Sequence, residues 1–481
     1  MSVQLKREYT PCSVETLASE VDIRLVVFFF AAHIPLALLM NKFNSVAWIH
    51  LITILGIGLW WVATDDRVER GAYIGAYIVG AEVLWRMTGA VPVWETGKYM
   101  TAALFIVAMM RFQRLRGPLV PIIYFALLLP SISSTIGANP TTARSQISFY
   151  LSGPLALMLS ACFFSHLRLL PQTLLRIFLS LIGPTVGVAA IAFYGILTTP
   201  NIEFGGSSNF ETSGGFGPNQ VSAVLGLGAL LALLMVLSNK LDLKLRVLMF
   251  GVVVLLAAQS AMTFSRGGLD MAVASAMVAL VFLLKSRNSI VKVSFLTAVL
   301  IVIGYFILLP YLDAFTKGAM SARFQETDST HRVDLIQDDL SAWSDNVVLG
   351  VGIGESKLYH QASFGGDIAA HTEFSRLLAE HGTLGLAAFV LIVVMGALNL
   401  KRAPTAFTRA IIAALICWSL LYMAVNAMRL VAPSFIFGLT FAEMMKERLS
   451  FEELSVLTQR YKLLLAYRLR QILNHRELDQ L

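Results

Sequence analysis

A run of ionisable side chains stands at the start of an apolar stretch that extends from His371 to Phe389. It consists of His371, Glu373, Arg376, Glu380 and His381. A charge inside a bilayer is costly unless it is paired or hydrated, so ionisable residues at such a place are candidates for function. The positive end of a helix dipole favours neutral imidazole, which can accept a proton from a hydroxyl group. His371 therefore has the properties of a general base; the alternative is a helix-capping histidine without chemistry.

Two arginines stand where topology does not require a cation. Arg266 lies in the sequence TFSRGGLD between two apolar runs, and Arg332 begins a segment, 331–348, with apolar residues at helical spacing. A guanidinium binds phosphate through two parallel hydrogen bonds, which predicts an anion site. The alternatives are an ordinary Gly-Gly hairpin at Arg266 and a surface ion pair of Arg332 with Asp334 or Asp328.

Two further sets of charges are spaced for pairing on one helical face. Arg376 follows Glu373 by three residues and precedes Glu380 by four. It either assists the base or only pairs with these carboxylates. Glu82 and Arg86 are four residues apart. They either form a buried ion pair that holds the helices together or contribute to a substrate site.

The composition identifies the kind of chain that must position these groups. Hydrophobic residues make up 57% and charged residues 14% of the 481 residues, and the mean hydropathy is +0.71. A soluble domain carries about 25% charged residues, so we expect an all-α polytopic membrane protein. Counting apolar runs long enough to cross a bilayer predicts about fourteen transmembrane helices. They lie near 22–40, 46–63, 71–88, 97–111, 118–136, 146–165, 174–197, 219–238, 245–263, 269–285, 290–312, 373–399, 409–428 and 432–447.

Charge distribution predicts the topology. Alternate connections are rich in Lys and Arg, which places them and both termini in the cytoplasm. The net charge of +7 therefore reports topology, and we expect no nucleic-acid partner. Residues 1–21 are predicted to be a cytoplasmic tail and 22–447 the transmembrane domain, with a large, partly helical outer loop at 313–370. Residues 448–481 are predicted to form a basic amphipathic helix that lies on the membrane lipid, the alternative being a dedicated partner site.

The motifs resemble those of one family of membrane enzymes. His371, a short polar spacer, an acidic residue and then Gly-x-x-Gly-Leu at 382–386 are similar to the signature helix of O-antigen ligases and O-antigen polymerases. Ser-Arg-Gly at 265–267 resembles the membrane-embedded arginine of that family. Arg332, a helical segment and then Gly-x-Gly-x-Gly at 350–354 resemble its outer loop. We expect the three glycines to bend that loop back over the membrane.

The resemblance implies a function. These enzymes are inverting glycosyltransferases of the bacterial inner membrane that move a glycan from polyprenyl (undecaprenyl) diphosphate to an acceptor sugar on the periplasmic side. The acceptor is lipid A core for a ligase, and a growing glycan for an O-antigen or exopolysaccharide polymerase. By resemblance, His371 activates the acceptor hydroxyl, and Arg266 and Arg332 hold the diphosphate. Arg376, Glu373, Glu380 and Arg86 are possible supporting residues.

Two further expectations concern cofactors and a rival function. The chain has no HExxH motif, no Cys and His cluster and no paired Asp in the short segment 41–45, so we expect neither a metal nor another cofactor. The rival is a carrier, such as a lipid-linked sugar flippase or an anion transporter, which would also hold cations within a bundle. Carriers tend to show internal repeats and paired broken helices, which the sequence does not indicate.

Overall fold

The computed structural model describes most of the chain between residues 21 and 445. The positions left out within that range are 113–116, 139, 201, 203, 205–207, 239–240, 285–289, 292–293, 296–297, 300–301, 326–331 and 365–371, and the side chains at 362 and 364. The chain divides into two compact units, Met1–Met444 and Met445–Leu481. Every element below belongs to the first unit. The predicted N-terminal tail, except for its last residue, and the predicted C-terminal helix lie outside the described residues.

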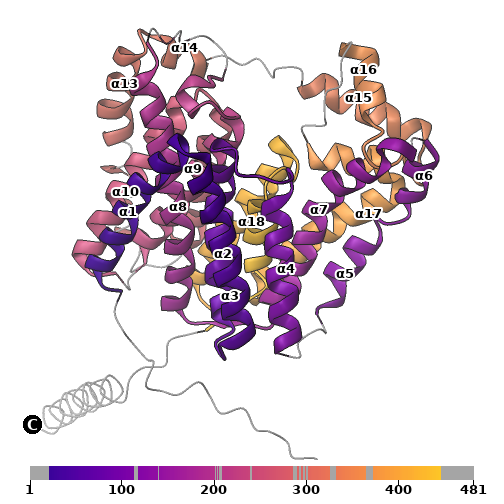
Figure 1. The fold of residues 1–481 in the computed structure, drawn as a ribbon, viewed down its shortest axis with the longest axis horizontal. Coiled ribbons are helices and arrows are strands. Elements are labelled where there is room, and N and C mark those ends of the chain that lie inside the picture. Colours follow the sequence, from indigo (N-terminus) through magenta and orange to yellow (C-terminus); the bar gives the residue numbers. More distant parts are fainter. Residues whose placement is uncertain are drawn as a thin grey trace, which may run out of the picture. The chain divides into compact units, whose positions relative to one another are not determined.

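The described part is almost entirely helical (Figure 1). Its long helices are α1 (Ile23–Lys42), α2 (Asn44–Thr64), α3 (Glu69–Met87), α4 (Thr96–Arg111), α7 (Pro140–Phe164), α8 (Pro171–Thr198), α9 (Pro218–Leu237), α10 (Leu243–Met262), α11 (Arg266–Leu283), α15 (Arg332–Asp345), α17 (Glu373–Arg402) and α18 (Ala406–Asn426). The shorter elements are α5 (Leu119–Ala126), α6 (Ser131–Ala138), η2 (Glu211–Ser213), η3 (Val302–Leu308), α13 (Leu309–Phe315), α14 (Ala319–Gln325), α16 (Lys357–Phe364) and α19 (Ala432–Leu439). Two short strands, β1 (Arg168–Leu169) and β2 (Glu443–Met444), pair in parallel.

The all-α, membrane-spanning character predicted from composition is confirmed, but the count of fourteen spans is not. Among the described residues, ten helical stretches are long and apolar enough to cross a bilayer: α1, α2, α5 together with α6, α7 to α11, α17 and α18. The described part of the predicted last span, 432–445, contains the eight-residue helix α19 and the two residues of β2. At about 1.5 Å per residue, α19 is roughly 12 Å long, too short to cross the hydrocarbon core by itself.

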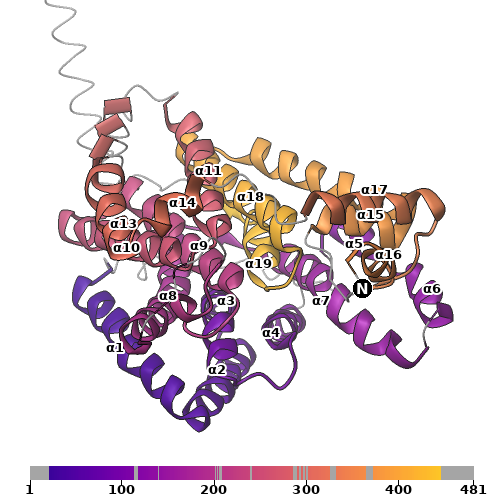
Figure 2. The same cartoon turned by 90° about the horizontal axis from the view of Figure 1, so that it is seen from above.

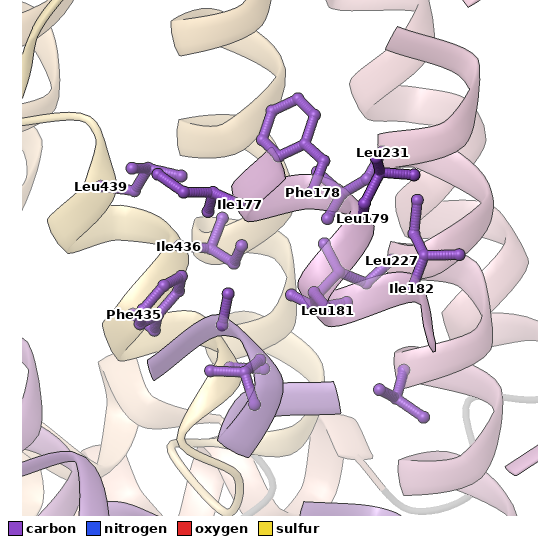
Figure 3. Close-up of a cluster of buried hydrophobic side chains, with 14 of the residues drawn as sticks. Ile177, Phe178, Leu179, Leu181, Ile182, Leu227, Leu231, Phe435, Ile436 and Leu439 are labelled. Atoms are coloured by element: carbon purple, nitrogen blue, oxygen red, sulfur yellow. The ribbon is translucent and has the colours of Figure 1, made fainter. Parts of the chain in front are cut away.

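Small residues allow the central helices to pack closely. A Cβ on Gly80 of α3 would lie 2.2 Å from the carbonyl oxygen of Leu181 in α8, so only glycine permits this approach. Lipid supplies no hydrophobic drive between helices, and close contact of this kind holds membrane bundles together. Figure 3 shows the apolar cluster beside this contact, in which Ile182 of α8, Leu227 of α9 and Phe435 of α19 are all fully buried.

Helix α17 is broken, which the sequence did not indicate. Gly382 has φ +61° and ψ −138°, and it separates a polar first segment, Glu373–His381, from an apolar second one. The helix predicted over 373–399 is thus present, but it bends at Gly382. Gly385 serves the break as well, because a Cβ there would lie 1.7 Å from the carbonyl oxygen of Leu377 in the same helix. Both glycines therefore permit a bend in their own helix.

The chain after α15 fills the break with its backbone. The amide of Val351 donates to the Ala379 carbonyl at 2.9 Å, and the amide of Thr383 donates to the Val347 carbonyl at 2.8 Å. Backbone groups released from a helix inside an apolar bundle need such partners, because no water replaces them there. We call residues 346–354 the docking loop.

Positive φ angles give the docking loop its course. Gly350, Gly352 and Gly354 have φ values of +70°, +106° and +75°. This conformation is favourable only for glycine, so the loop bends here as predicted. That the bend directs the loop over the membrane stays a prediction. Ile353 between them is fully buried and joins an apolar cluster with Leu377 of α17.

Four helices, α13 to α16, lie at one end of the bundle, which we call the loop end. They form two groups: α15 and α16 lie beside α17 and α6, whereas α13 and α14 lie near α10 (Figure 2). α15 follows the helical segment predicted at 331–348 within a few residues. The described part of the predicted outer loop is therefore largely helical, and its side of the membrane stays a prediction.

The break in α17 predicts that two glycine-to-alanine substitutions have unequal effects on thermal stability. Gly382→Ala places a Cβ within 2.6 Å of the Val347 carbonyl oxygen at a positive φ. The conformation alone costs about 1–3 kcal/mol, so we expect a clearly lower midpoint of thermal unfolding in detergent. Gly251→Ala is the control, because a Cβ at this helical position meets nothing within 4 Å. Equal midpoints for Gly382→Ala and the unchanged chain would contradict the described break.

Candidate active site

The predicted base, His371, lies outside the described residues, and its role stays a prediction. The structure does describe the helix that follows. Thr372 is the N-cap of α17, and its hydroxyl accepts a hydrogen bond from the Ser375 amide at 3.2 Å. Helix α17 therefore begins at Glu373, two residues after position 371, and not at the histidine as the dipole argument assumed.

The predicted pairing of Arg376 is present in full. Its guanidinium donates to both oxygens of Glu373, with Nε at 3.2 Å from Oε2, and also to Oε2 of Glu380. All three side chains are at most 1% exposed. The guanidinium also lies over the ring of Tyr150, 5.1 Å from its centroid. These contacts are those of a structural ion cluster, and they leave the fork of Arg376 engaged within the protein.

The structure brings Arg266 and Arg332 together. Arg266 is the first residue of α11 and Arg332 the first residue of α15. Burial lowers the pKa of Arg332 from its ordinary value, and the charges of Arg266, Arg323 and Arg429 lower it further. Arg332 is thus near enough to the other three guanidiniums for their charges to disfavour its charged form, and an anion at this place would favour it.

The sequence around Arg266 is not the hairpin that we considered. Gly267 and Gly268 lie within the first turn of α11, and the sharp turn before it is made by Phe264 at φ +56°. A Cβ on Gly268 would lie 2.1 Å from the carbonyl oxygen of Ser222, so this glycine permits the close packing of α11 against α9. Arg323 of α14 donates to the Phe264 carbonyl at 3.1 Å and ties α14 to this turn.

Arg86 has the structural role that we weighed against substrate binding. It donates to Glu82 and Gln220 at 2.7 Å each and to the Trp94 carbonyl at 2.8 Å. It also donates to the carbonyl of Arg429 at 3.1 Å. The pair with Glu82 is buried, so the predicted ion pair exists and fixes distant parts of the chain to α3.

A small pocket opens between α7, the start of α17 and the connection after α18. Its lining residues are Phe149, Tyr150, Glu373, Arg376, Ala427, Met428 and Arg429. Burial lowers the pKa of Arg429, whereas the neighbouring Tyr422 and Tyr150 oppose that shift. Sequence reasoning did not select Arg429 as a site residue. The available signal was that the predicted topology leaves Arg429 outside the cytoplasmic segments, where the positive-inside rule expects few cations.

A buried polar network at the loop end was also missed. Asp339 accepts from the Ser375 hydroxyl at 2.6 Å and lies 3.0 Å from Nε2 of His360. The carboxylate stands between the other two groups, so the imidazole does not activate the serine as in a hydrolase triad. The network instead joins α15, α16 and α17. Within the described residues, no three His, Cys, Asp or Glu side chains are grouped for a metal ion, and metal independence stays a prediction.

The fold and the comparison with known families agree on the kind of protein. The described helices are those of an α-helical, multi-pass membrane protein. Residues 251–390 match a family model described as O-antigen ligase. This segment contains Arg266, Arg332, the docking loop and position 371, so the resemblance predicted from these motifs is confirmed for it. No curated protein matches the chain.

The ion cluster predicts unequal effects of two charge substitutions in one helix. Arg376→Gln leaves two buried carboxylates without their cation, and breaking a buried pair costs about 3–5 kcal/mol. We expect a large fall in the midpoint of thermal unfolding at neutral pH. Lys401→Gln removes an exposed cation at the other end of α17 and should leave the midpoint nearly unchanged. A similar small effect of both substitutions would show that the cluster does not support the fold.

Proposed function

We propose that the chain is an inverting, metal-independent glycosyltransferase. It moves a glycan from a polyprenyl (undecaprenyl) diphosphate to an acceptor sugar on the periplasmic side of a bacterial inner membrane, with both termini in the cytoplasm. The observation that carries the proposal is the convergence of Arg266 and Arg332 at two helix starts, within the segment that matches the O-antigen ligase family.

The charges at this place suit the leaving group of the reaction. The acceptor oxygen attacks the anomeric carbon as the bond from that carbon to the diphosphate oxygen breaks, and the electron pair goes to the diphosphate. Arg266 and Arg332 offset the charge that grows there, and preformed donors are effective because they need little reorganisation. His371 takes the proton of the acceptor hydroxyl.

The acceptor distinguishes two forms of the proposal. A ligase transfers the glycan to a sugar of lipid A core, and an O-antigen or exopolysaccharide polymerase transfers it to a growing glycan. Donor, arginines and base are shared by both. The chain's own residues therefore perform the same steps in either case.

The broken helix α17 does not favour the alternative, a carrier. Carriers place broken helices around a substrate cavity near the midplane, where the released backbone groups bind the substrate. In α17 the released carbonyls of Ala379 and Glu380 accept from the amides of Val351 and Gly352, at 2.9 and 3.2 Å. The docking loop occupies the break, so these groups are not presented to a transported ligand.

The proposal predicts that the histidine and the arginines fail in different ways. In His371→Ala the donor should bind with its ordinary affinity while transfer falls by about 10²–10⁴-fold, as expected for loss of a general base. In Arg332→Ala and Arg266→Ala donor binding should weaken as well, and Lys should rescue only partly, because an ammonium lacks the planar fork.

Donor affinity and transfer rate are measured on the full chain in nanodiscs. Arg67→Ala serves as the control, because Arg67 forms only an exposed ion pair with Asp65. Transfer at the ordinary rate in His371→Ala, or weakened donor binding in that variant, would refute the assignment of the base.

A further inference from the structure

The connection between α18 and α19 has an unusual backbone course. α18 ends at Asn426, and the next residue, Ala427, has φ +50° and ψ −156°. An L residue adopts this conformation only when surrounding contacts enforce it, and such strain concentrates at functional sites. Ala427, Met428 and Arg429 all line the pocket described above. The strained residue therefore directs a cation into a cavity.

The buried pair on α3 holds this connection from both sides. Arg86 donates to the carbonyl of Arg429 at 3.1 Å, and Glu82 accepts from the amide of Val431 at 2.8 Å. Glu82 and Arg86 are 1% and 5% exposed, so these bonds are shielded from water and effective. Together these two hydrogen bonds fix the backbone position from which the side chain of Arg429 extends.

The same connection adjoins the start of α11. A Cβ on Gly267 would lie 3.4 Å from Cγ1 of Val425, so the first turn of α11 packs against the last turn of α18. Arg266 begins that turn of α11, and Arg429 follows Val425 by four residues. The charge of Arg429 also lowers the pKa of Arg332, so these two guanidiniums lie near each other.

Two guanidiniums line the pocket, those of Arg376 and Arg429. Arg376 is held by Glu373 and Glu380. Arg429 is half-buried, and its charge acts on Arg332 outside the pocket. Arg429 therefore lies close to both the pocket and Arg332.

We propose that Arg429 is a further phosphate-binding residue, which donates to an oxygen of the lipid diphosphate and is presented by the Glu82–Arg86 pair through the connection Ala427–Val431. The inference rests on the proposed function for the identity of the ligand. Arg429 is a binding residue, and Glu82 and Arg86 are positioning residues that act through it. The diphosphate thereby bridges the segment that matches the O-antigen ligase family and an arginine outside it.

The first test measures the affinity of the full chain in nanodiscs for polyprenyl diphosphate without a glycan. Arg429→Ala should weaken binding by tenfold or more, and Arg429→Lys should recover part of the loss. Arg168→Ala is the control, because Arg168 forms an exposed ion pair with Glu443. Equal affinities of Arg429→Ala, Arg429→Lys and the unchanged chain, while Arg332→Ala binds weakly, would overturn the role of Arg429 and leave the proposed function standing.

Two competitors identify the source of the phosphate. Inorganic pyrophosphate should displace the probe from the unchanged chain, and Arg429→Ala should weaken pyrophosphate binding as well. Phosphatidylglycerol added to the nanodisc should not displace the probe. Displacement by phosphatidylglycerol but not by pyrophosphate would show a general lipid-headgroup site and overturn the proposal. Failure of the unchanged chain to bind any of these ligands would overturn the proposed function together with it.

A double-mutant cycle tests the positioning role of Glu82. Glu82→Gln keeps the size of the side chain but cannot accept from both Arg86 and the Val431 amide, so it should weaken polyprenyl diphosphate binding. If Glu82 acts through Arg429, Glu82→Gln should have no further effect on affinity in the Arg429→Ala background. Additive losses would assign Glu82 a purely structural role and overturn this part of the inference.

Discussion

A helix that stops hydrogen bonding inside an apolar bundle must find other partners for its backbone, and the architecture of the loop end follows from this constraint. Gly382 interrupts α17, and the docking loop supplies amides and carbonyls to the released groups. The docking loop follows α15 directly, so the break fixes α15 relative to the first segment of α17. Arg332 at one end of α15 and the Asp339–His360–Ser375 network in its middle are thereby placed beside the start of α17.

Buried charges in this chain fall into two groups with different meanings. Arg86 with Glu82, and Arg376 with its two carboxylates, are compensated inside the protein and hold segments together. Arg332 lies close enough to Arg266, Arg323 and Arg429 for their charges to act on it. An anion bound there would offset that repulsion, and the lipid diphosphate of the proposed reaction is such an anion. We propose that Arg266, Arg332 and Arg429 bind substrate, whereas the two buried ion clusters support the fold.

Sequence periodicity and spacing predicted those features that depend on residues close together in the chain. Apolar runs predicted α1, α2 and α7 to α11 within a few residues, and the spacing of three and four predicted the contacts of Arg376. The break at Gly382 was not predicted, because a glycine in the sequence does not indicate that a distant loop will bond to the released backbone groups. The contact of Glu82 with Val431 escaped for a similar reason, since these residues are 349 positions apart. The eight-residue α19 was extended to a span because its apolar run continues beyond the helix.

The central claim is that the chain transfers a glycan from a lipid diphosphate to an acceptor sugar. Its most direct test uses proteoliposomes that contain the full chain, a labelled polyprenyl-diphosphate glycan and an acceptor, either lipid A core or an oligosaccharide, without an energy source. The account predicts that label becomes covalently attached to the acceptor and that polyprenyl diphosphate is released in equal amount. Label that crosses the bilayer still attached to its lipid, with no glycan on either acceptor, would contradict it.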